Sequence, residues 1–209
     1  MNADVDAGTG GAARGSSFLA EAPATVDAER LYRDDVEQVG YVMNLSKLWA
    51  YQPHTIDGLF ELLRECVHGG ELTFRQRGIL ISACASSIGD AYCSLAWGAR
   101  LSGEAGAGVA ASVLRGEDIG LDDAERALAQ WARHVARDPN GTSEADVDEL
   151  RVAGFTDAQI FAITVFVALR CAFSTVNDAL GARPDHELVE SAPNAVRAAV
   201  AFGRPADTI

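Results

Sequence analysis

Helix-start signals recur along this chain and constrain its fold more than any other feature. Three capping residues, Thr73, Asp122 and Thr156, are each followed three positions later by Glu or Gln. Such a capping residue accepts a hydrogen bond from a free backbone N–H group and so begins a helix. From Val26 onwards the sequence has almost no alternating β-branched runs of the kind that form strands. The sequence therefore predicts an all-α fold.

Apolar spacing extends the helix prediction over most of the chain, with a helix hairpin at its centre. Residues 78–88 and 160–180 are apolar on nearly every side, which predicts that both segments are buried all round. The predicted helices cover residues 28–49, with Gly40 as a weak point, 53–69, 73–101, 103–115, 122–137, 143–153, 156–180 and 193–202, the last as a short helix or a partner-binding tail.

Composition divides the chain into three parts. Residues 1–25 are rich in Gly, Ala, Ser and Asp, which predicts a disordered N-terminal tail. Residues 26–185 predict one folded domain, and residues 186–209 a C-terminal helix or tail. With 209 residues, 48% of them hydrophobic, the chain is long enough to bury a sizeable core.

The net negative charge of the chain limits the kinds of partner that it can bind. A net charge of -13 repels phosphate backbones, so we expect neither nucleic acid nor an anionic membrane as partner. No apolar run approaches about 20 residues without a charge, and the first residues lack the pattern of a signal peptide. The sequence therefore predicts a cytoplasmic protein.

The cysteines and histidines give no paired motif. No two cysteines stand in a Cys-x-x-Cys pair, and the four histidines lack the spacing of metal ligands. We therefore expect no disulfide scaffold, no metal and no cofactor. At least three of the cysteines are expected to be buried free thiols. The four are Cys66, Cys84, Cys93 and Cys171.

The segment 89–98 has the spacing of a thiol redox site. In a helical Cys-x-x-Cys-x-x-x-His motif, two thiols and an imidazole share one face, and the imidazole helps to lower the pKa of one thiol. Here those three positions hold Asp90, Cys93 and Trp97. Cys93 is the candidate nucleophile, without the second thiol and without the base.

This spacing and its surroundings resemble the carboxymuconolactone decarboxylase and alkyl hydroperoxidase D superfamily, nearest to its peroxidase-related branch. The resemblance covers roughly residues 39–181. It implies an alkyl hydroperoxidase D-like helical bundle, a homo-oligomer (dimer, trimer or hexamer) and antioxidant thiol chemistry. The family commonly has a glutamate where this chain has Gly78. The matching stretches are residues 40–45, 72–77, 91–93, 122–128, 137–139 and 153–160.

Two charged residues interrupt apolar segments, Asp90 late in 73–101 and Arg170 in 160–180. Because the resemblance implies that these two helices pack together, we expect Asp90 and Arg170 to lie near one another. They form either a structural ion pair or a catalytic carboxylate and an anchor for a substrate carboxylate. The alternative for Asp90 is a helix-face aspartate that reaches water. Trp97, Tyr92 and Ser86 complete the predicted substrate-binding set. For Trp97 the alternative is core packing, and for Ser86 a bond to its own helix.

Three functions are compatible with these residues. The first is a peroxidase-related thiol oxidoreductase, or its redox-impaired descendant, with Cys93 as the sole motif thiol. The second is a lyase or isomerase that uses Asp90 and Arg170 on a small carboxylated or aromatic substrate, and the third is a non-catalytic binding or assembly protein. Because residues of the motif that act as a unit are absent, we expect very low intrinsic hydroperoxidase turnover.

Overall fold

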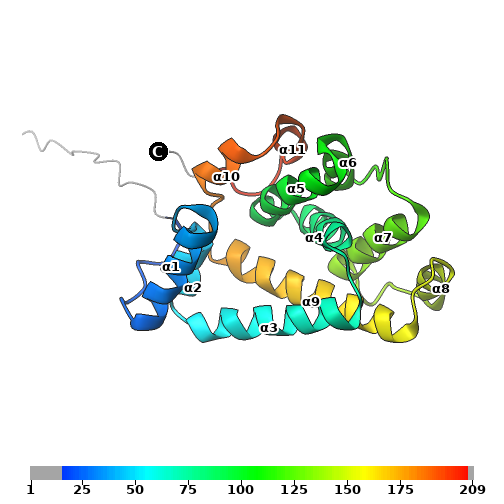
Figure 1. Ribbon diagram of the computed structural model, residues 1–209, viewed down its shortest axis with the longest axis horizontal. Coiled ribbons are helices and arrows are strands. Elements are labelled where there is room, and N and C mark those ends of the chain that lie inside the picture. The colour runs from blue at the N-terminus through cyan, green and yellow to red at the C-terminus, as the bar shows by residue number, and fades with distance from the viewer. Residues whose placement is uncertain (1–15, 207–209) are drawn as a thin grey trace, which may run out of the picture.

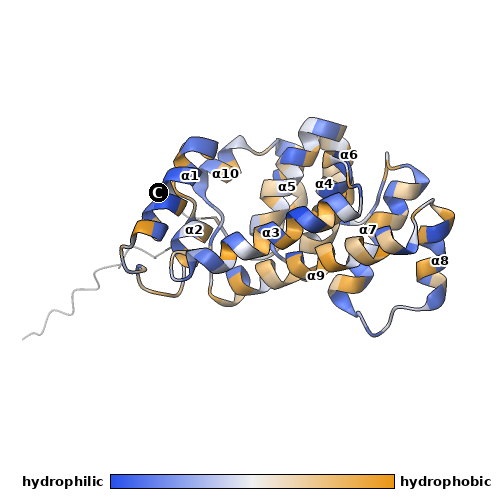
Figure 2. Cartoon of the chain, turned by 60° about the horizontal axis from the view of Figure 1, so that its bottom comes forward, coloured by the Kyte–Doolittle hydropathy of each residue, from blue (hydrophilic) through white to orange (hydrophobic). Residues whose placement is uncertain are grey.

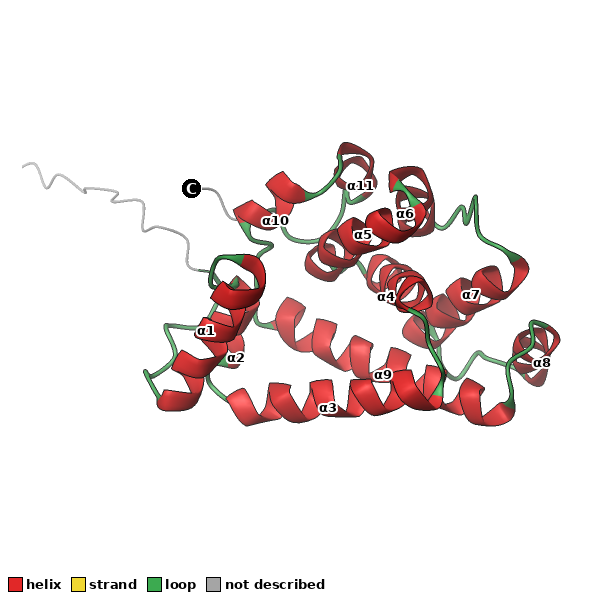
Figure 3. Cartoon of the chain, viewed as in Figure 1, coloured by secondary structure: helices red, strands yellow, loops and turns green. Residues whose placement is uncertain are grey.

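The computed structural model describes residues 16–206, and those residues form helices joined by loops, with no strand among them (Figure 3). The all-α prediction is confirmed. Thr73, Asp122 and Thr156 each cap a helix through a reciprocal capping box. The helices are α1 (Val26–Val39), α2 (Asn44–Trp49), α3 (Pro53–Gly69), α4 (Phe74–Ile88), α5 (Ala91–Ala105), α6 (Ala107–Arg115), α7 (Asp123–Arg137), α8 (Glu144–Val152), α9 (Asp157–Ala179), α10 (His186–Ser191) and α11 (Asn194–Ala199).

Helix α4 lies at the centre of the core. It packs against α5, with which it forms the predicted central hairpin, and also against α6, α7 and α9. Residues 78–85 of α4 are all buried, but residues 86–88 are half-buried, so the burial predicted for 78–88 stops short of the end of the helix. In Figure 1, α3 and α9 run side by side along one edge of the molecule, while α1 and α2 close one end. This arrangement leaves the start of α5 facing α1, α3 and α9.

Two helices that the sequence predicts as continuous are each broken at a glycine. Gly40 separates α1 from α2 with φ 89°, and Gly89 separates α4 from α5 with φ 80°. Glycine adopts these left-handed angles at little cost, so the chain can turn there. The break at Gly89 corrects the predicted helix 73–101. Asp90 is the N-cap of α5, and the stripe from Ser86 to Cys93 does not run along one helix.

The N-terminal end of the described chain lies against the segment that follows α9. Residues 1–15 of the predicted disordered tail fall outside the described residues. The part from residue 16 is attached, since Phe18 N donates to Leu180 O at 2.8 Å and Arg183 N donates to Ser16 O at 3.1 Å. The described end of the expected tail is therefore held by the domain. Helices α10 and α11 both lie within residues 186–209, the segment predicted as a C-terminal helix or tail, and α11 lies within the predicted helix 193–202.

Helix α9 is less completely buried than the sequence predicts. Ile163 and Phe166 face the core, but Phe161 is 72% exposed. Figure 2 colours the chain by residue hydropathy, and much of α9 is orange, the colour of hydrophobic residues. By length and composition α9 is the one described helix able to span a membrane, which is weak evidence because core helices pass the same test. The homo-oligomer stays a prediction. A monomer of 22.0 kDa in sedimentation at micromolar concentration would contradict it.

Candidate active site

Cys93 lies in the first turn of α5, and Asp90 sets its position. The Oδ1 atom of Asp90 accepts a hydrogen bond from Cys93 N at 2.9 Å, which caps the helix. The thiol therefore lies at a helix N-terminus, where the helix dipole favours negative charge. Gly89 permits this arrangement because its left-handed conformation redirects the chain just before the cap.

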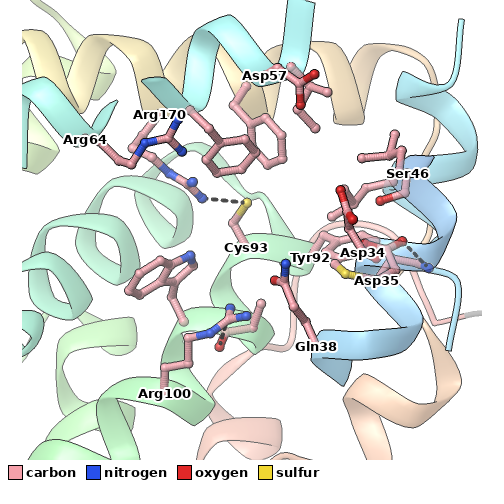
Figure 4. Close-up of a pocket in the computed structure, with 18 of the residues that line it drawn as sticks. Asp34, Asp35, Gln38, Ser46, Asp57, Arg64, Tyr92, Cys93, Arg100 and Arg170 are labelled. Atoms are coloured by element: carbon pink, nitrogen blue, oxygen red, sulfur yellow. Dashed lines mark hydrogen bonds between the residues drawn. The ribbon is translucent and has the colours of Figure 1, made fainter. Parts of the chain in front are cut away.

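Arg170 of α9 is the residue that reaches the thiol. Its Nη2 atom lies 3.3 Å from Cys93 Sγ (Figure 4), and Arg170 is only 4% exposed. Its guanidinium also lies 5.0 Å from the centre of the Phe173 ring and 5.8 Å from that of Trp97. The Arg170 guanidinium thus contacts both the Cys93 thiol and the aromatic rings beside it.

The predicted ion pair between Asp90 and Arg170 is wrong. Among the described residues, Arg170 forms no salt bridge, and its Nε atom is buried without a hydrogen-bond partner. The carboxylate of Asp90 is directed to the N-terminus of α5, where Oδ1 caps the helix and Oδ2 is buried without a partner. The break after Gly89 is the physical reason, because it makes Asp90 a cap and not a residue on a helix face.

The groups around Cys93 shift the pKa of its thiol in opposite directions. Burial raises the pKa of the Cys93 thiol most, and the nearby Asp90 charge raises it further. Arg170 and a hydrogen bond with Ser174 lower that pKa. The raising effects are larger, so the thiol is protonated at neutral pH. Chemistry at Cys93 then needs a group that takes the proton while Arg170 stabilises the thiolate.

The thiol lines a cavity of about 580 Å³. Four of the predicted site residues line it: Tyr92, Cys93, Trp97 and Arg170. Asp90 and Ser86 do not. Ser86 Oγ donates to Ala83 O at 3.3 Å, which is the local alternative for this residue. The other lining residues are Leu31, Asp34, Asp35, Gln38, Met43, Leu45, Ser46, Ile56, Asp57, Phe60, Glu61, Arg64, Ala96, Arg100 and Phe173.

Charge is divided unevenly around this cavity. Arg30 bridges two of the lining carboxylates, at 3.0 Å to Asp34 and 2.5 Å to Asp57. The labelled arginines Arg64, Arg100 and Arg170 lie around one side of Cys93 in Figure 4, and none of them forms a salt bridge with a described residue. The cavity therefore offers cationic groups for an anion and an apolar wall from the aromatic rings.

Tyr92 contributes its ring to the cavity but not its hydroxyl. The hydroxyl donates to the carboxylate of Asp185, which also accepts from Asn44 N at 2.7 Å. Burial raises the pKa of Tyr92, and the Asp185 charge adds to this effect. The hydroxyl thus ties α5 to the segment after α9 and is not free for a substrate.

Phe173 and Ser174 are among the residues of the site that sequence reasoning missed. They lie three and four positions after Arg170, so they share its face of α9. That spacing is the signal that could have identified them. Arg64 and Arg100 carry no comparable signal, because long basic side chains at helix surfaces are common.

No protein-family model matches this sequence, and neither does any curated protein sequence. Solved structures do match. A peroxidase-related protein from Ralstonia eutropha JMP134, described as an alkylhydroperoxidase AhpD core, has a TM-score of 0.74 at 24% identity, over 84% of this chain and 96% of that chain. A peroxidase-related protein from Silicibacter sp. TM1040 has a TM-score of 0.71 at 20% identity, over 84% and 93%.

A third structure of similar shape is an enzyme with a bound small molecule. It is a cysteine-to-alanine variant of the debrominase Bmp8 in complex with 2,3,4-tribromopyrrole, with a TM-score of 0.65 at 15% identity, over 87% of this chain and 95% of that chain. At such identities the comparison concerns the fold alone. The chain thus has the helical fold of the alkylhydroperoxidase AhpD core, the fold that its sequence resemblance implies.

Proposed function

We propose that this protein is a thiol-dependent oxidoreductase in which Cys93 reduces a small organic hydroperoxide bound in the cavity. One observation carries the proposal: the Cys93 thiol lines a cavity of about 580 Å³ with the Arg170 guanidinium 3.3 Å from its sulfur. A buried cation beside the sulfur stabilises the thiolate, and it also stabilises the negative charge that develops on the leaving oxygen.

The reaction needs no second protein thiol. Asp90, whose Oδ2 has no hydrogen-bond partner, takes the proton of Cys93. The thiolate attacks one peroxide oxygen and the O–O bond breaks, which gives a Cys93 sulfenic acid and an alkoxide. The alkoxide takes up the proton and leaves as an alcohol. One external thiol condenses with the sulfenic acid and releases water, and a second restores Cys93 and leaves as the external disulfide.

The comparisons support this class of chemistry at the level of the fold. Two structures of the same fold are described as peroxidase-related, and a third is a debrominase with a small aromatic ligand. The lyase or isomerase hypothesis has less support, because Asp90 does not line the cavity and cannot act directly on a substrate there. A binding protein without catalysis is the remaining alternative, and the experiment below separates it.

The test is oxidation of Cys93 by cumene hydroperoxide. Dimedone labelling with peptide mass spectrometry should locate a sulfenic acid at Cys93, and Cys93→Ser should abolish thiol-dependent peroxide consumption. Cys66→Ser is the matched control, because Cys66 does not line the cavity. Peroxide consumption that is unchanged in Cys93→Ser would overturn the proposal, and so would a Cys93 that stays unmodified.

Turnover is a separate measurement. With an external dithiol the rate should stay far below that of a relative with an intact Cys-x-x-Cys pair, because each cycle waits for a thiol from solution to reach a buried sulfur. A rate equal to that of such a relative would contradict this expectation, although it would leave the assignment of Cys93 in place.

A further inference from the structure

A second pair of thiols lies outside the cavity. Cys84 of α4 and Cys171 of α9 are 87 positions apart in the sequence, yet their Sγ atoms lie 3.4 Å apart and share a hydrogen bond. Helices α4 and α9 pack directly against each other, so tertiary packing holds the two sulfurs together. Neither residue lines the Cys93 cavity. Only Cys84 and Cys93 are buried, whereas Cys66 and Cys171 are half-buried, so the expectation of at least three buried thiols is wrong.

The distance suits reversible bond formation. A disulfide has its sulfurs about 2.05 Å apart, so closure requires them to approach by only about 1.4 Å. Cys84 is buried and Cys171 is half-buried, so solution reagents reach the pair from the Cys171 side.

The charges around the pair distinguish its two members. The hydrogen bond from Cys84 lowers the pKa of Cys171, and the neighbouring Arg170 lowers it further against the effect of burial. The same hydrogen bond and burial raise the pKa of Cys84. Cys171 is thus the member that carries the negative charge first, and it is also the more exposed one. Both properties favour Cys171 as the attacking thiol.

We propose that Cys84 and Cys171 form a redox-active dithiol, a second redox centre that closes to a disulfide at the expense of a small disulfide of the glutathione type. The Cys171 thiolate attacks one sulfur of the small disulfide, which forms a mixed disulfide and releases one thiolate. Cys84 then loses its proton to solvent and attacks the Cys171 sulfur. The second small thiol leaves, so two protein thiols are oxidised and one disulfide is reduced to two thiols.

This centre does not depend on the proposed function of Cys93, since none of its steps uses Cys93 or the cavity. It places a cross-link between α4 and α9 one residue from Arg170. The chain lacks the second thiol of the motif at Asp90, but it has a dithiol between α4 and α9, with one of its two thiols on the helix that carries Arg170.

The experiment is incubation of the whole reduced chain with glutathione disulfide, followed by non-reducing peptide mapping. The expected product is the Cys84–Cys171 disulfide, formed equally in Cys93→Ser and in the control Cys66→Ser and reversed by dithiothreitol. In Cys84→Ser the reaction should stop with one glutathione attached to Cys171. In Cys171→Ser, Cys84 should stay unmodified.

Circular dichroism shows whether each variant folds. Where a variant does not fold, peptide mapping of the wild-type chain alone tests whether the Cys84–Cys171 disulfide forms. A wild-type chain that keeps both thiols free would overturn the proposal. A chain that stops at a glutathione adduct on Cys171, or pairs Cys171 with another cysteine, would overturn it as well.

Discussion

Two arginines in this molecule, Arg133 and Arg170, have opposite surroundings. Arg133 of α7 donates to both carboxylate oxygens of Asp118, at 2.8 and 2.7 Å, and to Val113 O at 2.9 Å. Arg170 of α9 is the more deeply buried of the two, but it contacts a thiol and two aromatic rings, and its Nε atom has no partner. The first charge is matched within the chain and the second is not.

We propose that the difference separates a structural charge from a functional one. A bidentate Arg–carboxylate pair satisfies both ions and fixes the loop after α6 against α7. An unmatched buried guanidinium costs free energy of folding, and so does the buried Asp90 whose Oδ2 lacks a partner. Proteins retain such unfavourable groups where function needs them. The comparison therefore points to Arg170, and not Arg133, as a group held ready for a reaction.

The largest expected effect is on stability at the matched pair. Arg133→Met leaves the Asp118 carboxylate buried without its partner, so it should lower the free energy of unfolding by about 3–5 kcal/mol in urea denaturation. The double variant Arg133→Met with Asp118→Asn should recover much of that loss. Asparagine is the suitable replacement because residue 118 has φ 55°. A loss below about 1 kcal/mol would remove the contrast between the two arginines.

The second expected effect is on reactivity at the unmatched arginine. Arg170→Met breaks no ion pair, so its stability cost should stay within about 1.5 kcal/mol, as for a replacement of similar volume. Loss of the cation raises the pKa of Cys93, and each unit of that rise lowers the thiolate fraction about tenfold. Oxidation of Cys93 by cumene hydroperoxide should slow by about tenfold. Arg133→Met supplies the control, because it should leave the oxidation rate of the folded chain unchanged.

The sequence predicts the fold better than it predicts the site. Capping boxes and apolar spacing identify most helices because these signals are local, and the central burial of α4 follows from its composition. The site depends on one backbone angle at Gly89, which turns Asp90 from a helix-face residue into a cap. Helical periodicity assumes a continuous helix, so it placed Ser86 on the face of the site, whereas Ser86 does not line the cavity. For the same reason it paired Asp90 with Arg170, whereas Asp90 caps α5. Contacts such as Cys84 with Cys171 depend on tertiary packing, which local patterns do not encode.

The smallest expected effect concerns Asp178, a half-buried carboxyl of α9 near Asp90. Burial, together with the nearby Asp90 charge, raises the pKa of Asp178 to about 6, although Arg204 opposes this. A carboxyl whose folded-state pKa is raised favours the folded chain most when it is protonated, and this contribution is lost as the pH rises from about 4 through about 6. Asp178→Asn stays neutral, so it should be more stable than the wild type at pH 7–8, by less than about 1 kcal/mol after solvent screening. This difference in stability between the variant and the wild type should shrink as the pH falls to 4.

The exposed Asp123→Asn serves as control for a change of net charge. A stability difference between Asp178→Asn and the wild type that is constant from pH 4 to pH 8 would contradict the prediction, because it would show that the charge of Asp178 is matched by its surroundings.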